Sequence, residues 1–301
     1  MMAETGTIPF TYNQETYQTW YKVVGDISSD IRPVIALHGG PGFSHHYMLP
    51  HAELAKSRGI PVIFYDQIGN GESSHPANKP KEFWSLDLFM DELDNLLAHF
   101  RINDNFDLVG HSWGAMLALH YASHRQPQGL KHLVIVSGTP ATELWVEGTT
   151  RLRKQLPPDV LDVLERHEAA GTTDSKEYQD ALMVFYKKHV CTLDPWPKQL
   201  LQSFDVMGKD PTVYTTMWGS SEMSADGTLR TWTCVDQLHT IHCPTLLTNG
   251  RMDEAHDVNV MPMFNKLPRV KWVQFANSSH LAFFEEPERY IAVVSDFLLN
   301  A

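Results

Sequence analysis

The residues best suited to do chemistry lie in the segment GHSWG at 110–114, which has the pattern GxSxG. An apolar strand pattern, Phe106 to Val109, leads into it, and a helical pattern over 115–124 follows at once. This context is the one that a nucleophile elbow requires, in which a tight turn lifts a serine hydroxyl above a sheet. Glycines flank the serine because such a turn leaves no room for side chains. Ser112 is therefore predicted to be a catalytic nucleophile.

A serine hydroxyl needs a base to remove its proton and an acid to orient that base. Asp253 comes shortly after the strand pattern Thr245 to Leu247, and His280 follows the strand pattern Val270 to Phe275. Both residues thus lie beyond the carboxyl end of a strand, at the edge where open α/β sheets gather their ligands. Their order along the chain, after the serine, is also the expected one. We predict a catalytic triad of Ser112, His280 and Asp253.

A glycine-rich segment, HGGPG at 38–42, follows the strand pattern Val34 to Leu37. A loop in this position supplies one backbone donor to an oxyanion hole, and the residue after the nucleophile supplies the other. We therefore assign the amides of Gly40 and Trp113 to the oxyanion hole. There they would stabilise the negative charge that develops in a tetrahedral intermediate.

The strands and helices that must position these residues can be predicted from the sequence. Short apolar runs alternate with longer helical patterns, and this alternation favours a mostly parallel sheet covered by helices. An apolar stripe over 86–100 predicts one covering helix. The segment from Ile8 to Val24 predicts an antiparallel hairpin, turning at Asn13 and Gln14, at the edge of the sheet. The other predicted strands are Val34 to Leu37, Val62 to Tyr65, Phe106 to Val109, Leu133 to Val136, Thr245 to Leu247 and Val270 to Phe275.

The strand signal disappears between the fourth and fifth of these runs, and helical patterns such as Asp159 to Ala170 and Ser175 to Val190 replace it. Alternation then resumes and ends in an amphipathic helix from about Pro287 to Leu299. We predict an α/β-hydrolase fold with an inserted helical lid. The expected parts are a first core segment at 1–139, the lid at 140–236 and a second core segment at 237–301.

Composition and charge exclude several other classes of protein. With 36 acidic and 24 basic residues the formal net charge is −12, which disfavours nucleic acid or anionic lipid as a partner. No apolar stretch reaches the length of a membrane span, and no signal peptide is recognisable, so we expect a cytoplasmic location. His120 and His124 have helical i, i+4 spacing without the HExxH pattern, and the three cysteines form no Cys-x-x-Cys pair. We expect neither a metal nor a cofactor.

Taken together, these motifs resemble those of the proline iminopeptidases, serine peptidases that remove an N-terminal residue, preferably proline. The resemblance covers nearly the whole chain. It is carried by HGGPG at 38–42, DQIGNGES at 66–73, GHSWG at 110–114 and Asp253-Glu254. In that family, a lid glutamate and the glutamate beside the triad aspartate hold the N-terminal ammonium of the substrate. The resemblance implies these roles for Glu222 and Glu254.

The expected function is therefore that of a serine aminopeptidase, which releases an N-terminal residue, preferably proline, from peptides through an acyl-enzyme intermediate. The expected partner is a small-molecule or short peptide substrate with a free N-terminus. The alternative is hydrolysis of amino-acid amides, esters or a related small metabolite, because the same triad and ammonium anchor serve all of these substrates. An epoxide hydrolase or dehalogenase is disfavoured because relatives of that kind have an aspartate in the place of Ser112. A non-catalytic binding protein of this fold need not keep nucleophile, base and acid together, and this sequence has all three.

Overall fold

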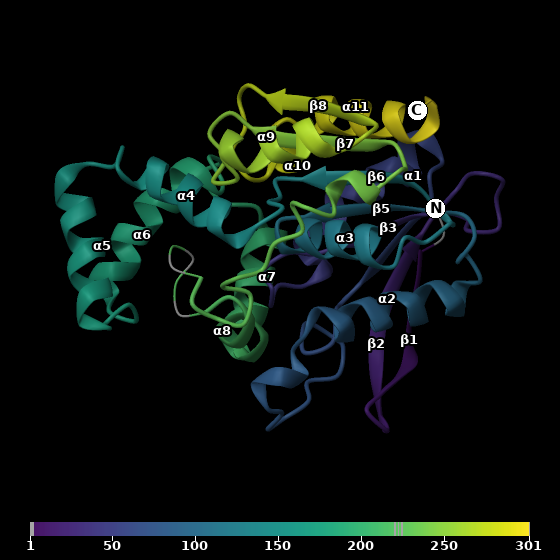
Figure 1. The fold of residues 1–301 in the computed structure, drawn as a ribbon, viewed down its shortest axis with the longest axis horizontal. Helices are drawn as coiled ribbons and strands as arrows, with labels where there is room; N and C mark the ends of the chain where they lie inside the picture. Colours follow the sequence, from purple (N-terminus) through teal and green to yellow (C-terminus); the bar gives the residue numbers. More distant parts are fainter. Residues whose placement is uncertain (1–2, 220, 222, 224, 301) are drawn as a thin grey trace.

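An eight-stranded sheet organises the chain in this computed structural model, which describes residues 3–219, 221, 223 and 225–300 (Figure 1). The strand order is β1-β2-β4-β3-β5-β6-β7-β8. The strands β1, β2 and β4 pair antiparallel, and every pair from β4 to β8 is parallel. The strands are β1 (Ala3–Tyr12), β2 (Glu15–Val24), β3 (Val34–Leu37), β4 (Val62–Tyr65), β5 (Phe106–His111), β6 (Leu130–Val136), β7 (Thr245–Gly250) and β8 (Val270–Phe275).

Helices cover the sheet and fill the long connection between β6 and β7. They are α1 (Ala52–Arg58), α2 (Leu86–Phe100), α3 (Trp113–His124), α4 (Thr142–Arg153), α5 (Pro158–Ala170), α6 (Lys176–His189), α7 (Lys198–Lys209), α8 (Thr212–Met217), α9 (Asp257–Lys266), α10 (Ala282–Glu285) and α11 (Pro287–Asn300). Over the described ranges, none of them combines the length and the apolar character needed to cross a lipid bilayer. The predicted α/β-hydrolase fold, with its mostly parallel sheet between helical layers, is confirmed.

The strands β3 (VIAL) and β4 (VIFY) are apolar at every position because the sheet is covered on both faces. In β3, Ile35 and Leu37 belong to a core cluster that includes residues of α2, α3 and α9. Their neighbours Val34 and Ala36 belong to a second cluster, which includes residues of α1 and α11. Successive side chains of a strand point to opposite faces, so an unbroken apolar run is what two buried faces require.

The predicted N-terminal hairpin is confirmed. Asn13 and Gln14 form its turn with positive φ angles of 48° and 67°, and β1 pairs with β2 along its whole length. A two-residue turn with both φ angles positive matches the twist of the flanking strands, which is why asparagine is favoured there. The hairpin adds an antiparallel edge to the sheet through the pairing of β2 with β4.

The other predicted strands and helices are also found, with small differences at their ends. The strands β5, β6 and β7 are longer than their apolar runs, because backbone pairing continues into residues such as Gly110 and Gly250 that carry no apolar side chain. The helix α2 begins after Ser85, whose hydroxyl accepts a hydrogen bond from the amide of Leu88 at 3.3 Å. Ser175 caps α6 in the same way, accepting from Tyr178 at 3.2 Å.

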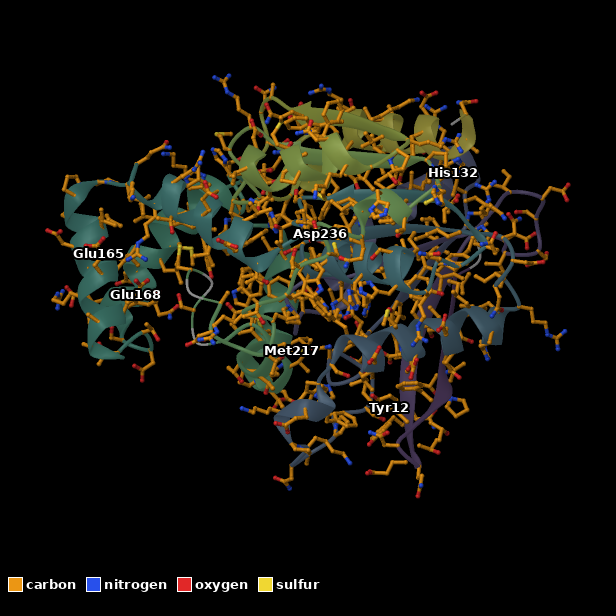
Figure 2. The ribbon with its side chains drawn as sticks, viewed as in Figure 1. Tyr12, His132, Glu165, Glu168, Met217 and Asp236 are labelled. Carbon is orange, nitrogen blue, oxygen red and sulfur yellow. The ribbon has the colours of Figure 1, made fainter. Side chains whose placement is uncertain are left out.

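The segment between β6 and β7 forms α4 to α8 within the described residues. Its two ends are joined by backbone hydrogen bonds, from Cys234 to Pro140 at 2.8 Å and from Thr142 to Trp232 at 3.0 Å. Figure 1 shows α5 and α6 projecting away from the sheet, and Figure 2 shows Glu165 and Glu168 on this outlying pair. The pair has its own apolar cluster, built around residues such as Phe185. We propose that 140–236 forms a lid on a core made of 1–139 and 237–301.

One acidic side chain of α2 is fully buried on the face that packs against the sheet. Glu92 accepts hydrogen bonds from the amide of Ile68, at 2.9 and 3.1 Å to its two oxygens, and lies 2.5 Å from Thr19 Oγ1. Burial raises the pKa of Glu92 to about 8, and the negative charge of Asp66 acts in the same direction. The neutral carboxyl group therefore ties α2 to β2 and to the loop that follows β4.

We expect this carboxyl group to make folding stability depend on pH. Its pKa is about 8 in the folded chain and near the ordinary 4.5 when unfolded. A raised folded pKa gives stability that is present in full below about pH 4.5 and is lost as the pH rises toward about 8. Glu92→Gln stays neutral and keeps the same hydrogen-bonding positions. From acidic to alkaline buffer, the melting temperature of the wild type should therefore fall by about 2 °C or more relative to that of the Glu92→Gln variant. Parallel curves of melting temperature against pH would contradict this assignment.

Candidate active site

Ser112 lies in the sharp turn between β5 and α3, with φ 55° and ψ −119°. This region is unfavourable for a residue with a side chain and is found where surrounding structure enforces it. A Cβ atom on Gly110 would lie 2.3 Å from the carbonyl oxygen of Gly114. One on Gly114 would lie 2.1 Å from the carbonyl oxygen of Leu37. Only glycine fits at both positions, so the GxSxG pattern here has a steric cause, and Ser112 occupies the geometry of a nucleophile elbow.

The structure brings His280 and Asp253 together at the same edge of the sheet. His280 Nδ1 lies 2.7 Å from Asp253 Oδ1, and both side chains are buried. Ser112 and His280 line one cavity. With Nδ1 donating to the carboxylate, Nε2 is left to accept a proton. The three residues predicted as a triad thus come from the ends of three different strands and meet in one place.

Asp253 is fixed by more than its contact with His280. Its Oδ1 accepts from the amide of Ala255 at 2.8 Å. Its Oδ2 accepts from the amide of Gly250 at 3.1 Å and from the hydroxyl of Ser137 at 2.6 Å. The sequence analysis did not identify Ser137. The available signal was a polar residue directly after the strand β6, at the edge of the sheet that carries the other site residues.

A second chain of hydrogen bonds runs from His280 toward the glycine-rich segment. His111 Nε2 donates to the carbonyl oxygen of His280 at 2.9 Å, and Nδ1 lies 2.8 Å from Tyr47 Oη. That hydroxyl accepts from the amide of Gly39 at 2.6 Å. Burial lowers the pKa of His111 well below its usual range, with a further contribution from His280. His111 is therefore neutral and links the triad histidine to the loop beside Ser112.

Gly40 lines the same cavity as Ser112, and Trp113 is the next residue along the chain. Gly40 has φ 115°, and a Cβ atom there would lie 2.4 Å from the amide nitrogen of Gly42, so no other residue fits. Trp113 is the first residue of α3, and its indole ring is buried. A Cβ atom on Gly39 would lie 3.0 Å from Ser112 Cβ, which shows how closely the loop approaches the nucleophile. Both assigned amides therefore belong to segments that flank Ser112.

The two glutamates implied by the family resemblance differ in what the structure describes. Glu254 is 4% exposed, and its Oε1 lies 3.5 Å from His280 Nε2. A carboxylate so close to the reacting end of the histidine can attract a cation in the cavity. Glu222 lies outside the described residues. Its neighbour Ser221 is buried and lies 3.0 Å from Tyr178 Oη of α6.

The cavity beside Ser112 is closed on one side by the helical segment. Its walls from that segment are mostly apolar or aromatic. Among the described residues that line it, Glu254 is the single acidic one. The ring of Trp145, from α4, lies edge-on to that of His280, with the two ring centroids 5.7 Å apart. The lining residues from the helical segment are Tyr186, Val190, Leu200, Phe204, Met207 and Tyr214.

His120 and His124, whose spacing could suggest a metal site, pack against each other with ring centroids 3.8 Å apart and ring planes inclined by 34°. Within the described part of the chain, no group of three histidine, cysteine, aspartate or glutamate side chains is arranged to hold a metal ion.

Comparison with known proteins gives consistent results over most of the chain. Residues 32–287 match the family described as alpha/beta hydrolase fold. A proline iminopeptidase from Heyndrickxia coagulans is 40% identical, over 88% of this chain and 90% of the relative. Among solved structures, VinJ is 45% identical with a TM-score of 0.94, over 98% of both chains. The proline iminopeptidase of Mycobacterium smegmatis is 37% identical with a TM-score of 0.90, over 97% of both chains.

Proposed function

We propose a function from one premise: the chain belongs to the proline iminopeptidase family, whose members have the alpha/beta hydrolase fold. It is a serine hydrolase. We infer that it releases the N-terminal residue, preferably proline, from short peptides through an acyl-enzyme intermediate. The reaction is proposed to take place in the cytoplasm, in keeping with the expectation from the sequence.

In the proposed mechanism, His280 Nε2 removes the hydroxyl proton of Ser112 as its oxygen attacks the carbonyl of the N-terminal residue. The amides of Gly40 and Trp113 donate to the oxyanion of the tetrahedral intermediate. His280 then gives the proton to the leaving amine, and the C–N bond breaks to leave an ester on Ser112. Water attacks this ester with His280 as base, and the released acyl group is the free amino acid. Asp253 holds the imidazole and stabilises its charged form.

The buried carboxylate of Glu254, 3.5 Å from His280 Nε2 in the cavity that holds Ser112, is the observation that carries the proposal. An aminopeptidase must recognise a free ammonium group one residue away from the nucleophile. A carboxylate in a partly dry cavity binds such a group more strongly than one in water. We propose Glu254 and Glu222 as the ammonium anchors. The apolar cavity walls suit a substrate without further charge near the scissile bond.

Hydrolysis of amino-acid amides or esters is the second candidate. It is supported by the same observation, because the anchor and triad act only on the ammonium and carbonyl of the substrate. Comparing prolyl peptides with prolyl amide and prolyl methyl ester ranks the two candidates by specificity constant.

The recognition of a free ammonium group leads to a prediction about blocked substrates. Charge-assisted hydrogen bonds contribute about 1.5–3 kcal/mol each, so N-acetylprolyl 4-nitroanilide should be cleaved roughly 100-fold less efficiently than prolyl 4-nitroanilide. Glu254→Gln should lower kcat/KM for the free substrate by roughly 10- to 100-fold and change it little for the blocked one. Glu222→Gln should act in the same way. The measurement is kcat/KM for both anilides in each protein.

The matched control is Glu82→Gln, which changes an exposed glutamate outside the cavity and should leave both rates unchanged. Hydrolysis of 4-nitrophenyl acetate, which has no ammonium group, should largely survive in the Glu254 variant. Equal cleavage of free and blocked anilides by the wild type would reject the aminopeptidase function and leave a general esterase or amidase.

A further inference from the structure

We propose that Gln67 is a positioning residue of the oxyanion hole, which orients the Gly40 amide through His38 and fixes Trp113 through its indole ring. The proposal rests on the proposed function in one respect, because it takes the amides of Gly40 and Trp113 as the donors. Gln67 lies in the DQIGNGES segment after β4 and is fully buried. It makes no contact with the reacting atoms in the proposed mechanism.

The side chain of Gln67 bridges the two segments that flank Ser112. Its Nε2 donates to the carbonyl oxygen of His38 at 3.0 Å. Its Oε1 accepts from the indole Nε1 of Trp113 at 2.8 Å. His38 begins the glycine-rich loop after β3, and Trp113 begins α3. The amide of one side chain thus sets the separation between the loop that carries Gly40 and the helix start that carries Trp113.

The chemistry of the two partners requires a primary amide at position 67. A backbone carbonyl only accepts hydrogen bonds, and an indole N–H only donates them. Glutamate at 67 would place an oxygen against the carbonyl of His38. Methionine would leave two buried polar groups without a partner. Each unsatisfied group is costly in a dry interior.

The backbone of Gln67 also determines the state of the His38 ring. Its amide donates to His38 Nε2 at 3.0 Å, so the ring proton resides on Nδ1. That nitrogen lies 3.0 Å from the carbonyl oxygen of Gly39 and donates to it. Burial lowers the pKa of His38 to about 4, which keeps the ring neutral and this arrangement intact at ordinary pH.

The bond to Gly39 orients the donor of Gly40, because both groups belong to one planar peptide unit. In a trans peptide the C=O of Gly39 and the N–H of Gly40 point in opposite directions. Fixing the carbonyl with His38, and with the amide of Phe43 at 3.3 Å, therefore fixes the direction of the Gly40 N–H. The backbone amide of Gln67 therefore acts on the Gly40 donor through the His38 ring. The side chain of Gln67 acts on the start of α3, which carries the Trp113 donor, through the indole.

Hydrogen bonds of neighbouring residues fix the backbone position of Gln67. The amide of Ile68 donates to the buried carboxyl of Glu92, and the carbonyl oxygen of Gln67 accepts from the backbone amide of Asn70 at 3.0 Å and from its side chain at 3.1 Å. The loop is therefore held independently of any substrate. Oxyanion stabilisation depends on donors that are in place before charge develops. A residue that only positions them should affect the transition state more than substrate binding.

The test compares three variants with the wild type. Gln67→Met keeps the length of the side chain and removes both bridging hydrogen bonds, Gln67→Glu removes the donor, and Trp113→Phe removes the indole donor but keeps the backbone amide. We expect kcat for prolyl 4-nitroanilide and for 4-nitrophenyl acetate to fall roughly 10- to 100-fold in Gln67→Met, with KM within about threefold. Affinity for a prolyl boronic acid, which forms a tetrahedral adduct on Ser112, should fall by a similar factor, while inhibition by free proline should not change.

The single-bond variants should show the same pattern with smaller effects. In the double variant of Gln67→Met and Trp113→Phe the losses should be less than multiplicative, because both remove one shared contact. The control Gln179→Met, on the exposed surface of α6, should match the wild type. If Gln67→Met does not fold, the proposal is tested with Trp113→Phe and Gln67→Glu, for which kcat, KM, affinity for the boronic acid and inhibition by proline are measured in the same way.

The proposal is rejected if the folded variants keep kcat and boronate affinity within twofold of the wild type. It is also rejected if proline affinity and KM worsen as much as kcat, since that pattern indicates general disruption of the site. The acetate ester keeps this test separate from the proposed function. A wild type that hydrolyses the ester and leaves prolyl substrates intact would reject the aminopeptidase while the role of Gln67 is still measured on the ester.

Discussion

Replacing Ser112 with alanine is expected to lower kcat/KM for prolyl 4-nitroanilide by roughly 10⁴- to 10⁶-fold, the range seen when a serine hydrolase loses its nucleophile. The loss should be this large because His280 and the oxyanion donors have no covalent step to assist once the hydroxyl is gone. What activity remains would come from water in a site that still binds substrate. The fold should survive, since alanine adds no atoms to a turn that already accommodates a Cβ at φ 55°.

Two measurements separate lost chemistry from lost structure. The melting temperature of the variant should lie close to that of the wild type, and a fluorophosphonate probe should label the wild type and leave Ser112→Ala unlabelled. Ser57→Ala, at an exposed serine of α1, is the matched control and should change neither rate nor labelling. Near-normal turnover by Ser112→Ala would show that another residue is the nucleophile.

The sequence could predict the fold because its strands are local patterns. A short strand pattern of three to six residues is visible without knowing its neighbours, and the runs Val34 to Leu37 and Val62 to Tyr65 correspond to β3 and β4. The nucleophile was equally local, since the turn at Ser112 needs its glycines within two residues. Asp253 and His280 could be proposed because each follows a strand, and strands of a parallel sheet end at the same edge.

The contacts that hold the site residues in place could not be predicted from the sequence, because they join segments that are distant in the chain. Ser137 meets Asp253 across 116 residues and Tyr47 meets His111 across 64, pairings that depend on strand order rather than on any local pattern. Gln67 belonged to a recognised motif, yet nothing local indicated that its amide reaches both His38 and Trp113. Glu92 belongs to the helix that was predicted over 86–100, but nothing in the local pattern indicated that its carboxyl group is buried.

Asp253→Asn is expected to lower kcat/KM by roughly 10⁴-fold, even though the new side chain has the same shape. Oδ1 accepts from His280 Nδ1 and from the amide of Ala255, and Oδ2 accepts from the amide of Gly250. Each carboxylate oxygen therefore faces a backbone N–H that can only donate. An asparagine NH₂ group would meet a donor in either orientation.

If the NH₂ group takes the place of Oδ1, His280 must accept at Nδ1, and its Nε2 then carries the proton and cannot act as the base. In the opposite orientation His280 keeps its tautomer, but the NH₂ group faces the amide of Gly250 and the imidazolium loses its counter-charge. Both orientations impair proton transfer, so kcat should fall far more than KM rises.

The measurement is kcat and KM for prolyl 4-nitroanilide and 4-nitrophenyl acetate. The ester rate distinguishes Asp253 from Glu254, because the triad acid serves every substrate and an ammonium anchor serves only free N-termini. A severe loss of ester hydrolysis in Glu254→Gln together with an unaffected Asp253→Asn would reverse the assignment of the two acids.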